Sequence, residues 1–235
     1  MNQKIISEVW VYPIKSLPGV RVKSAYVLGK GLEGDRRYML VDENNVFMTQ
    51  RDFPGMALLD VSFDKTTIRV RTVKNEKLGT LEVERQQQQG ESFRTKVWND
   101  EVEVVEVNEK YSKWFSEALN VKCKLVFFPE GNARQVDPDH VKDEHHVSLA
   151  DSYPFLVVGV SSVDDLSKRV GASLSVKRFR PNFVVVGSEP YEEDGWRDFK
   201  VGDLLFTGIR PCGRCAIITI DPETGERGDD PLKTL

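Results

Sequence analysis

The sequence predicts a mainly β fold with a few helices (α+β). Short runs of β-branched and aromatic residues recur between residues 4 and 107, with turn residues between them, which is the spacing of an all-β sandwich or barrel. Two stretches carry helical signals instead. Apolar residues recur at helical spacing within 110–119, and 161–169 begins with serines followed by aspartates, as a helix N-terminus does.

The expected strands follow one another along the whole chain. Pro13 lacks an N–H and should end the first of them, and Asn44 with Asn45 supplies a hairpin turn. Cys123 lies in an apolar strand, where we expect a buried thiol. The expected strands are residues 4–12, 20–28, 35–42, 46–49, 58–63, 67–73, 81–83, 102–107, 122–128, 152–158, a buried strand ending at 186, two β segments within 196–206, and 216–220.

A polar, loop-like segment, residues 129–150, indicates a boundary between two regions, 1–128 and 129–235. It holds all three histidines, and the adjacent pair His145 and His146 raises the possibility of a metal site. We favour solvated loop histidines, because adjacent side chains on an extended segment diverge and no further ligand lies at a suitable spacing. The glutamine run at 86–89 is expected to be an exposed loop without a role.

Composition and charge exclude several classes of protein. The net charge of −4 gives no reason to expect nucleic acid or an anionic membrane as a partner. No apolar run approaches the roughly 18 residues of a membrane span, and the N-terminal residues lack the apolar core of a secretory signal. Three cysteines are an odd count that argues against a disulfide framework. We therefore expect a cytoplasmic protein.

The motif PCGRC, residues 211–215, is the candidate reactive site. A Cys-x-x-Cys pair is typical of a thioredoxin-like redox site or of half a zinc site. Zinc needs a second ligand pair, which the chain does not supply at the required spacing. A thioredoxin motif begins a helix, whereas Cys215 is followed by the β-like run 216–220. Two half-buried thiols at a strand end are the structural alternative.

Basic residues stand beside several of the apolar runs. They are Lys15 with Ser16, Arg36 with Arg37, the segment 177–180, and Arg214. Strand ends carry the loops that bind ligands, and arginine binds phosphate in a bidentate manner that hydroxyl groups can complete. Each basic segment alone could be a solvated flank. Together, beside a thiol, they predict an anion-binding surface that holds a cofactor.

These segments resemble the MOSC family in its two-part form, and the resemblance extends from residue 9 to residue 235. It includes relatives such as the mitochondrial amidoxime-reducing components and bacterial proteins that reduce N-hydroxylated bases. The resemblance implies an N-terminal β-barrel region, 1–128, packed on a MOSC β-barrel domain, 129–235. The matching motifs are VYPIKS (11–16), GDRRYMLV (34–41), ADSYPF (150–155), RFRPN (178–182), EDGW (193–196), PCGRC (211–215) and DPETG (221–225).

The resemblance also implies a molybdenum–molybdopterin cofactor, with the Cys215 thiolate bound to the metal. A soft thiolate suits a molybdenum atom that the pterin sulfurs already hold. Cys212 is not a ligand in the family and is expected to be a packed neighbour. The residues that would bind the pterin and its phosphate are Lys15, Ser16, Arg36, Arg180, Asn182 and Arg214, with Ser152 and Gly213 at the edge of the site.

The implied activity is a molybdenum-dependent reduction of N-hydroxylated compounds. The alternative is a persulfide carrier, or a module that binds molybdopterin without turnover. We expect no PLP, no Fe–S cluster and no NAD site in this chain, so that electrons come from a separate ferredoxin- or flavoprotein-type donor. Relatives continue beyond the segment that matches residues 231–235, so the MOSC domain is expected to be short at its C-terminus.

Overall fold

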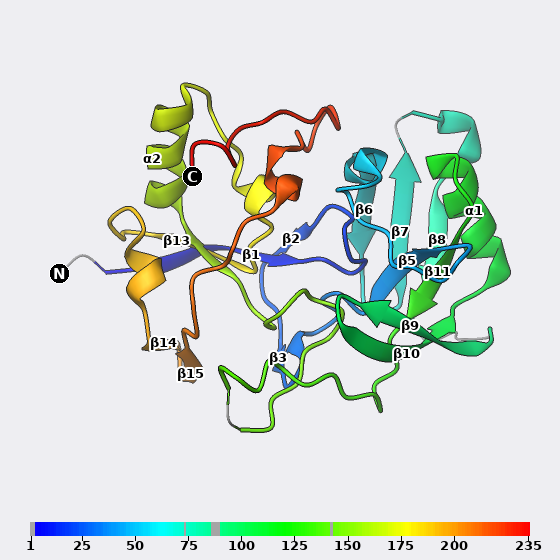
Figure 1. Cartoon of the computed structure of the whole chain (residues 1–235), viewed down its shortest axis with the longest axis horizontal. Coiled ribbons are helices and arrows are strands. Elements are labelled where there is room, and N and C mark those ends of the chain that lie inside the picture. Colours follow the sequence, from blue (N-terminus) through cyan, green and yellow to red (C-terminus); the bar gives the residue numbers. More distant parts are fainter. Residues whose placement is uncertain (1–2, 73, 86–89, 142) are drawn as a thin grey trace.

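The computed structural model describes residues 3–72, 74–85, 90–141 and 143–235, and it confirms the mainly β fold (Figure 1). In these ranges there are two α-helices, α1 (Glu109–Leu119) and α2 (Val160–Val170), both close to the predicted positions. The strands are β1 (Ile5–Val11), β2 (Val20–Val22), β3 (Val27–Leu28), β4 (Gly31–Leu32), β5 (Tyr38–Asp42), β6 (Leu59–Phe63), β7 (Thr67–Thr72), β8 (Leu81–Glu84), β9 (Ser92–Val97), β10 (Asp100–Glu106), β11 (Cys123–Phe127), β12 (Val157–Gly159), β13 (Phe183–Val186), β14 (Asp198–Val201) and β15 (Leu204–Thr207).

The first half of the chain is built on two antiparallel sheets and one helix. One sheet has the order β5-β11-β10-β9, and the other has the order β6-β7-β8. Figure 1 shows both sheets beside α1. The side chain of Asn108 caps α1 by accepting a hydrogen bond from the Lys110 N–H, and the helix buries Tyr111 and Phe115 in the largest apolar core. Cys123 is buried in that core, as predicted.

A four-stranded sheet, β12-β13-β1-β2, joins the beginning of the chain to its second half. β12 and β13 are parallel and are connected through α2, whereas β1 pairs antiparallel with both β13 and β2. Val9 lies opposite Phe183, and the Trp10 N–H donates to the Asn182 carbonyl oxygen at 2.9 Å. This pairing places the loop after β1, which carries Lys15 and Ser16, near the segment that precedes β13.

Several predicted strands are shorter than expected or are replaced. The run 20–28 is divided, because β2 pairs with β1 whereas β3 forms a hairpin with β4. The run 152–158 pairs only from Val157, since Pro154 has no N–H and the Leu156 N–H donates to the Asn182 side chain. Strand β9 was not predicted. Val73 and the glutamine run 86–89 lie outside the described residues.

The main error among the predicted elements is the strand expected for the apolar run after Cys215, residues 216–220. This run forms a short 3-10 helix, η5 (Ala216–Thr219), and not a strand. The Ile218 N–H donates to the Cys215 carbonyl oxygen at 3.2 Å, and Ile218 packs into a cluster with Val163 and Leu166 of α2. Packing against α2 therefore overrides the β propensity of the isoleucines, as tertiary context often does.

None of the helices in the described ranges has the length and apolarity needed to cross a membrane.

The core packing of α1 gives a test of the fold. Phe115 has no exposed surface, so Phe115→Ala should lower the free energy of unfolding by about 3–5 kcal/mol. Lys113→Ala on the same helix is the matched control. It removes only an exposed pair with Glu109, so its effect should stay within about 0.5 kcal/mol. Urea denaturation measures both changes, and equal losses would contradict the assigned core face of α1.

Candidate functional site

The Cys-x-x-Cys motif lies on an irregular segment between β15 and η5, and its two thiols differ in environment. Cys215 is half-buried and precedes the first residue of η5. Arg51 approaches it from the first half of the chain, with 3.7 Å between Arg51 Nη1 and Cys215 Sγ. Cys212 is exposed, so the expectation that it packs as a neighbour was wrong. The structure thus places one thiol, Cys215, in a half-buried position beside a cation.

Arg51 belongs to a series of side-chain contacts that the sequence analysis did not predict. Its guanidinium carbon lies 4.4 Å from the centroid of the Trp98 ring. The Trp98 Nε1–H donates to Asp151 Oδ1 at 3.0 Å, and the same oxygen accepts from Lys15 Nζ. The series runs from Cys215 to Lys15 and joins three segments of the first half to two of the second. Neither Arg51 nor Trp98 belongs to the recognised motifs, which explains why both were missed.

Lys15 is 5% exposed, and two oxygens satisfy its ammonium group. Its Nζ donates to the Leu149 carbonyl oxygen at 2.8 Å as well as to Asp151. Burial lowers the pKa of Lys15 to about 8, and the Asp151 carboxylate opposes that effect. Burial alone would raise the pKa of Asp151, but the charge of Lys15 and its hydrogen bond lower it overall. The pair therefore holds both charges at neutral pH.

Two guanidinium groups lie over the ring of Tyr12. The carbon of the Arg36 guanidinium is 4.2 Å from the ring centroid, and that of Arg180 is 4.5 Å away. Tyr12 is 2% exposed, and its hydroxyl donates to the Pro181 carbonyl oxygen at 3.1 Å. Burial raises the pKa of Tyr12 to about 12, so the ring stays neutral under the two cations.

The two arginines differ in what their side chains contact. Arg36 donates to Asp35 at 2.6 Å, to the Asn182 side chain at 3.1 Å and to the Arg180 carbonyl oxygen at 3.1 Å. Within the described part of the chain, the Arg180 guanidinium has no hydrogen-bond or ion-pair partner. Burial lowers the pKa of Arg180 to about 10. Arg180 is therefore a half-buried cation available to an anionic ligand.

Three of the predicted binding residues share an unusual backbone conformation. Ser16, Arg36 and Arg180 have φ angles of 65°, 47° and 55°. Residues with side chains seldom adopt this left-handed region, and such strain is concentrated at functional sites. At each of these positions the surrounding hydrogen bonds hold the backbone. The Gln50 side chain donates to the Ser16 carbonyl oxygen at 2.7 Å, and the Arg36 N–H donates to the Tyr12 carbonyl oxygen at 2.7 Å.

The remaining predicted residues take different positions. Asn182 is 1% exposed, and its amide is used entirely within the protein. The Arg214 guanidinium carbon lies 5.3 Å from the Phe179 ring centroid. Ser152 is exposed, and a Cβ at Gly213 would meet no atom within 4 Å. These contacts make Asn182 a support for neighbouring segments. Gly213 is exposed and Arg214 half-buried next to Cys215 in the chain, whereas no contact joins Ser152 to Cys215 among the described residues.

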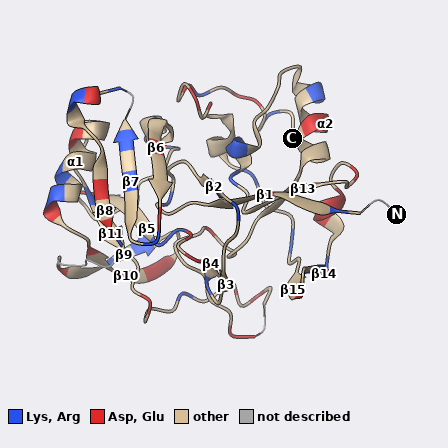
Figure 2. Ribbon diagram, turned by 180° about the vertical axis from the view of Figure 1, so that it is seen from behind, with Lys and Arg blue, Asp and Glu red and all other residues tan. Residues whose placement is uncertain are grey.

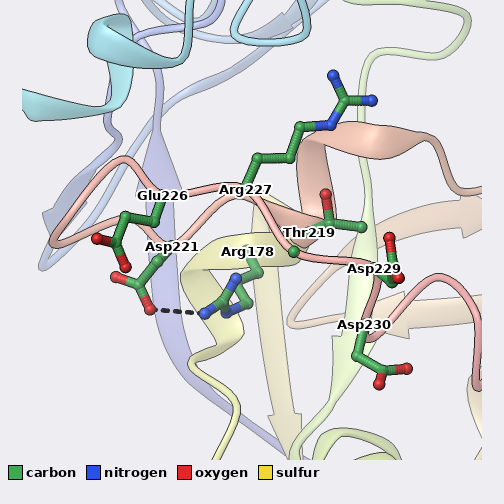
Figure 3. A pocket seen from close by; sticks show the side chains of 8 residues that line it. Arg178, Thr219, Asp221, Glu226, Arg227, Asp229 and Asp230 are labelled. Atoms are coloured by element: carbon green, nitrogen blue, oxygen red, sulfur yellow. Dashed lines mark hydrogen bonds and ion pairs between the residues drawn. The ribbon is translucent and has the colours of Figure 1, made fainter.

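Two cavities adjoin this region. One, of about 270 Å³, is lined by Tyr12, Arg180, Gln50 and Ile217 among others, so it reaches from Tyr12 and Arg180 to the helix that follows Cys215. The other, of about 500 Å³, lies at the turn formed by residues 221–230, where Arg178 points toward Asp221 at 2.6 Å (Figure 3). Basic and acidic residues are otherwise interspersed over both halves (Figure 2). Of these two cavities, the smaller is lined both by the aromatic side chains Trp10 and Tyr12 and by Arg180, whose guanidinium has no hydrogen-bond or ion-pair partner among the described residues.

The described residues contain no group of three or more His, Cys, Asp or Glu side chains that could hold a metal ion. His146 contacts Glu144 at 3.5 Å, and His140 contacts Asp137 at 3.1 Å. A metal bound at Cys215 would accordingly take most of its donor atoms from a ligand that accompanies it.

Comparison with known proteins matched two family models to the chain. The MOSC N-terminal beta barrel domain covers residues 3–122, and the MOSC domain covers residues 144–235. The chain is 30% identical to molybdenum cofactor sulfurase 2 of Culex quinquefasciatus over 100% of its own length and 32% of that protein. It is 28% identical to human mitochondrial amidoxime-reducing component 1, covering 98% of this chain and 70% of that protein. It is also 28% identical to human molybdenum cofactor sulfurase, covering 28% of that protein. The chain thus spans about a third of the length of these sulfurases.

The Lys15–Asp151 pair gives a testable prediction. Asp151→Asn removes the negative charge that favours the ammonium form, so the pKa of Lys15 should fall below about 8. NMR titration of the protein with ¹³C-methylated lysines measures that pKa. Asp60→Asn is the matched control, because Asp60 pairs with Arg71 on the surface and should leave the Lys15 titration unchanged. An unchanged or raised pKa in Asp151→Asn would contradict the assigned pair.

Proposed function

The chain belongs to the MOSC family, and from this premise we propose that it binds the molybdenum–molybdopterin cofactor and reduces N-hydroxylated compounds. The observation that carries the proposal is the half-buried Cys215 thiol, which lies 3.7 Å from the Arg51 guanidinium, two residues before Ile217 in the lining of a cavity that Arg180 also lines. One relative is named an amidoxime-reducing component, and others are named molybdenum cofactor sulfurases. Both kinds of name support a function associated with the molybdenum cofactor.

The residues present fit such a cofactor in their chemistry. A thiolate is a soft donor for molybdenum, and the Arg180 guanidinium offers a bidentate fork to a phosphate group. Arg214 adds a second cation next to Cys215. Arg36 and Asn182 would act on the cofactor through Arg180, because the Arg36 side chain holds both the Asn182 amide and the Arg180 carbonyl oxygen. Lys15, which is buried, would add to the positive electrostatic potential of the site.

When bound, the cofactor would supply the two-electron chemistry that cleaves the N–O bond. The balance of the reaction consumes two electrons and two protons, and it releases water from the N-hydroxyl group. The chain would supply the Cys215 thiolate, hold the pterin anion and shape the substrate pocket. The proposal includes a separate ferredoxin- or flavoprotein-type donor for the electrons. It also retains the cytoplasmic location as a prediction, although one relative is named mitochondrial.

A second candidate function is a sulfur carrier or a cofactor-binding module without turnover. The match along the full chain to proteins named molybdenum cofactor sulfurases favours it. In this function Cys215 would carry a persulfide. Mass spectrometry of the purified protein separates the two candidates, because one added sulfur atom on Cys215 without bound pterin supports the carrier.

Cys215→Ser should remove the soft metal donor and lower molybdenum retention more than about tenfold. The measurement is the ratio of molybdenum to protein after anaerobic reconstitution with the cofactor and desalting, followed by assay with an amidoxime. Cys212→Ser is the matched control, since this thiol is exposed three positions away and should leave retention and activity as in the parent. Equal molybdenum content in the two variants would overturn the assigned ligand.

Arg180→Ala should weaken retention of molybdopterin by about tenfold or more, because charge-assisted hydrogen bonds to the phosphate would be lost. Fluorescence of the released, oxidised pterin quantifies the bound cofactor. Arg180→Lys keeps the charge without the fork and should lie between the parent and the alanine variant. Arg94→Ala, at a side chain that is 78% exposed, controls for loss of one positive charge. Full retention in Arg180→Ala would refute the phosphate contact.

A further inference from the structure

Arg51 contacts the thiol of Cys215, yet the function proposed above gives this arginine no task. We propose that Arg51 is a positioning residue that raises the reduction potential of a metal bound at Cys215, because it donates a hydrogen bond to the ligating sulfur from a fixed place on the Trp98 ring. The inference rests on the proposed function for the metal. It adds a control of the metal's electron affinity that comes from the first half of the chain.

The contact joins a cation directly to the sulfur. Arg51 Nη1 donates to Cys215 Sγ at 3.7 Å. Among the described residues no carboxylate forms an ion pair with Arg51, so the protein leaves its positive charge for the sulfur. A cation that donates to a thiolate withdraws electron density from it, and hydrogen bonds at a ligating cysteine sulfur tune the potential of the metal.

The backbone of Arg51 is fixed by a turn that is anchored in the core. Thr49 is 1% exposed, and its hydroxyl accepts from the Arg51 N–H at 3.2 Å and donates to Asp52 at 3.1 Å. The Arg227 side chain donates to the Arg51 carbonyl oxygen at 3.4 Å. Both halves of the chain therefore hold the residue in place.

The ring of Trp98 supports the other end of the Arg51 side chain. The guanidinium carbon lies 4.4 Å from the ring centroid, a contact that orients a guanidinium without using its N–H groups. Trp98 has a φ of 60° in the two-residue turn after β9, which such turns normally give to Gly or Asn. Phe47 at 5.7 Å and the hydrogen bond to Asp151 at 3.0 Å hold the ring in this strained position.

Arg51 differs from Arg180, the arginine assigned to the phosphate. Among the described residues that line the cavity of about 270 Å³, Arg180 is present and Arg51 is not. Arg51 also uses one N–H on the sulfur, whereas the Arg180 guanidinium has no acceptor in the described part of the chain. Arg51 is accordingly placed to act on the ligating sulfur, and not on the pterin phosphate.

The step that this contact affects is electron delivery by the ferredoxin- or flavoprotein-type donor. The donor is oxidised and the bound metal is reduced, one electron at a time, and no bond at Cys215 forms or breaks. Reduction adds negative charge beside the sulfur, and the Arg51 cation favours the more negative state. Loss of the cation should make the metal harder to reduce.

Redox titration of the reconstituted full chain, followed by the paramagnetic resonance signal of molybdenum(V), tests the inference. Arg51→Ala should lower the equilibrium constant for reduction by about tenfold, or about 59 mV for a one-electron step. Arg51→Lys keeps the charge without the planar fork and should lie between. Arg94→Ala, at a side chain that is 78% exposed, is the matched control and should leave the potential unchanged.

Two results of this titration would overturn the inference. One is a parental potential in Arg51→Ala. The other is a loss of bound pterin as large as in Arg180→Ala, because Arg51 would then anchor the cofactor. Trp98→Ala should lower the potential less than Arg51→Ala does, and it should add nothing in the Arg51→Ala background. An additive change would overturn the supporting role of Trp98. Circular dichroism and thermal melting confirm that the variants fold.

A probe that needs no cofactor separates this inference from the proposed function. In a Cys212→Ser background, cyanylation of Cys215 places a nitrile on the sulfur, while Cys123 is buried and stays unlabelled. The infrared band of the nitrile reports the local electric field, so it should move in Arg51→Ala and not in Arg94→Ala. A band that moves in a protein without bound molybdenum supports the cation at the sulfur, and the proposed function then fails alone. A band that stays in place overturns the inference.

Discussion

The buried amide of Asn182 is the contact on which the arrangement of the site depends. It donates to the Trp10 carbonyl oxygen at 3.2 Å and accepts from the Leu156 N–H and from Arg36. An unsatisfied buried amide costs about 1–3 kcal/mol, so each of these partners is held in place by the need to satisfy it. One side chain thereby fixes β1, the segment before β12 and the arginine that supports Arg180.

This arrangement divides the cations of the site into two groups with different tasks. Lys15 is buried and Arg36 is half-buried, and both are already bonded to carbonyl or carboxylate oxygens, so they give the surrounding surface its shape and part of its positive field. Arg180 and Arg214 lie on aromatic rings, and their guanidinium nitrogens have no acceptor among the described residues. Aromatic stacking orients a guanidinium without using its N–H groups, so these two stay available to a ligand.

Much of the fold, and the motif-bearing part of the site, could be predicted from the sequence. Helical spacing and β-branched runs are local signals, and they located α1, α2 and most strands. The contact between Arg51 and Cys215 joins residues 164 positions apart, and no local pattern reports such a contact. The motif RFRPN (178–182) includes Asn182, but it does not indicate whether the Asn182 amide binds a ligand or other groups of the protein. The strand predicted for residues 216–220 was wrong, because packing on α2 determined the conformation of this run and local propensity does not include such packing.

The pairing of β1 with β13 has a consequence for how the protein is made. The Ser7 hydroxyl bonds to the Val184 carbonyl oxygen across 177 positions, so one edge of β1 lacks its partner until that late segment leaves the ribosome. Pairings of such long sequence separation form slowly, and an open apolar edge is prone to aggregate. Pairing with β2 protects only the other edge during this interval. The late pairing that assembles the site thus also leaves one edge of β1 open to aggregation until synthesis is nearly complete.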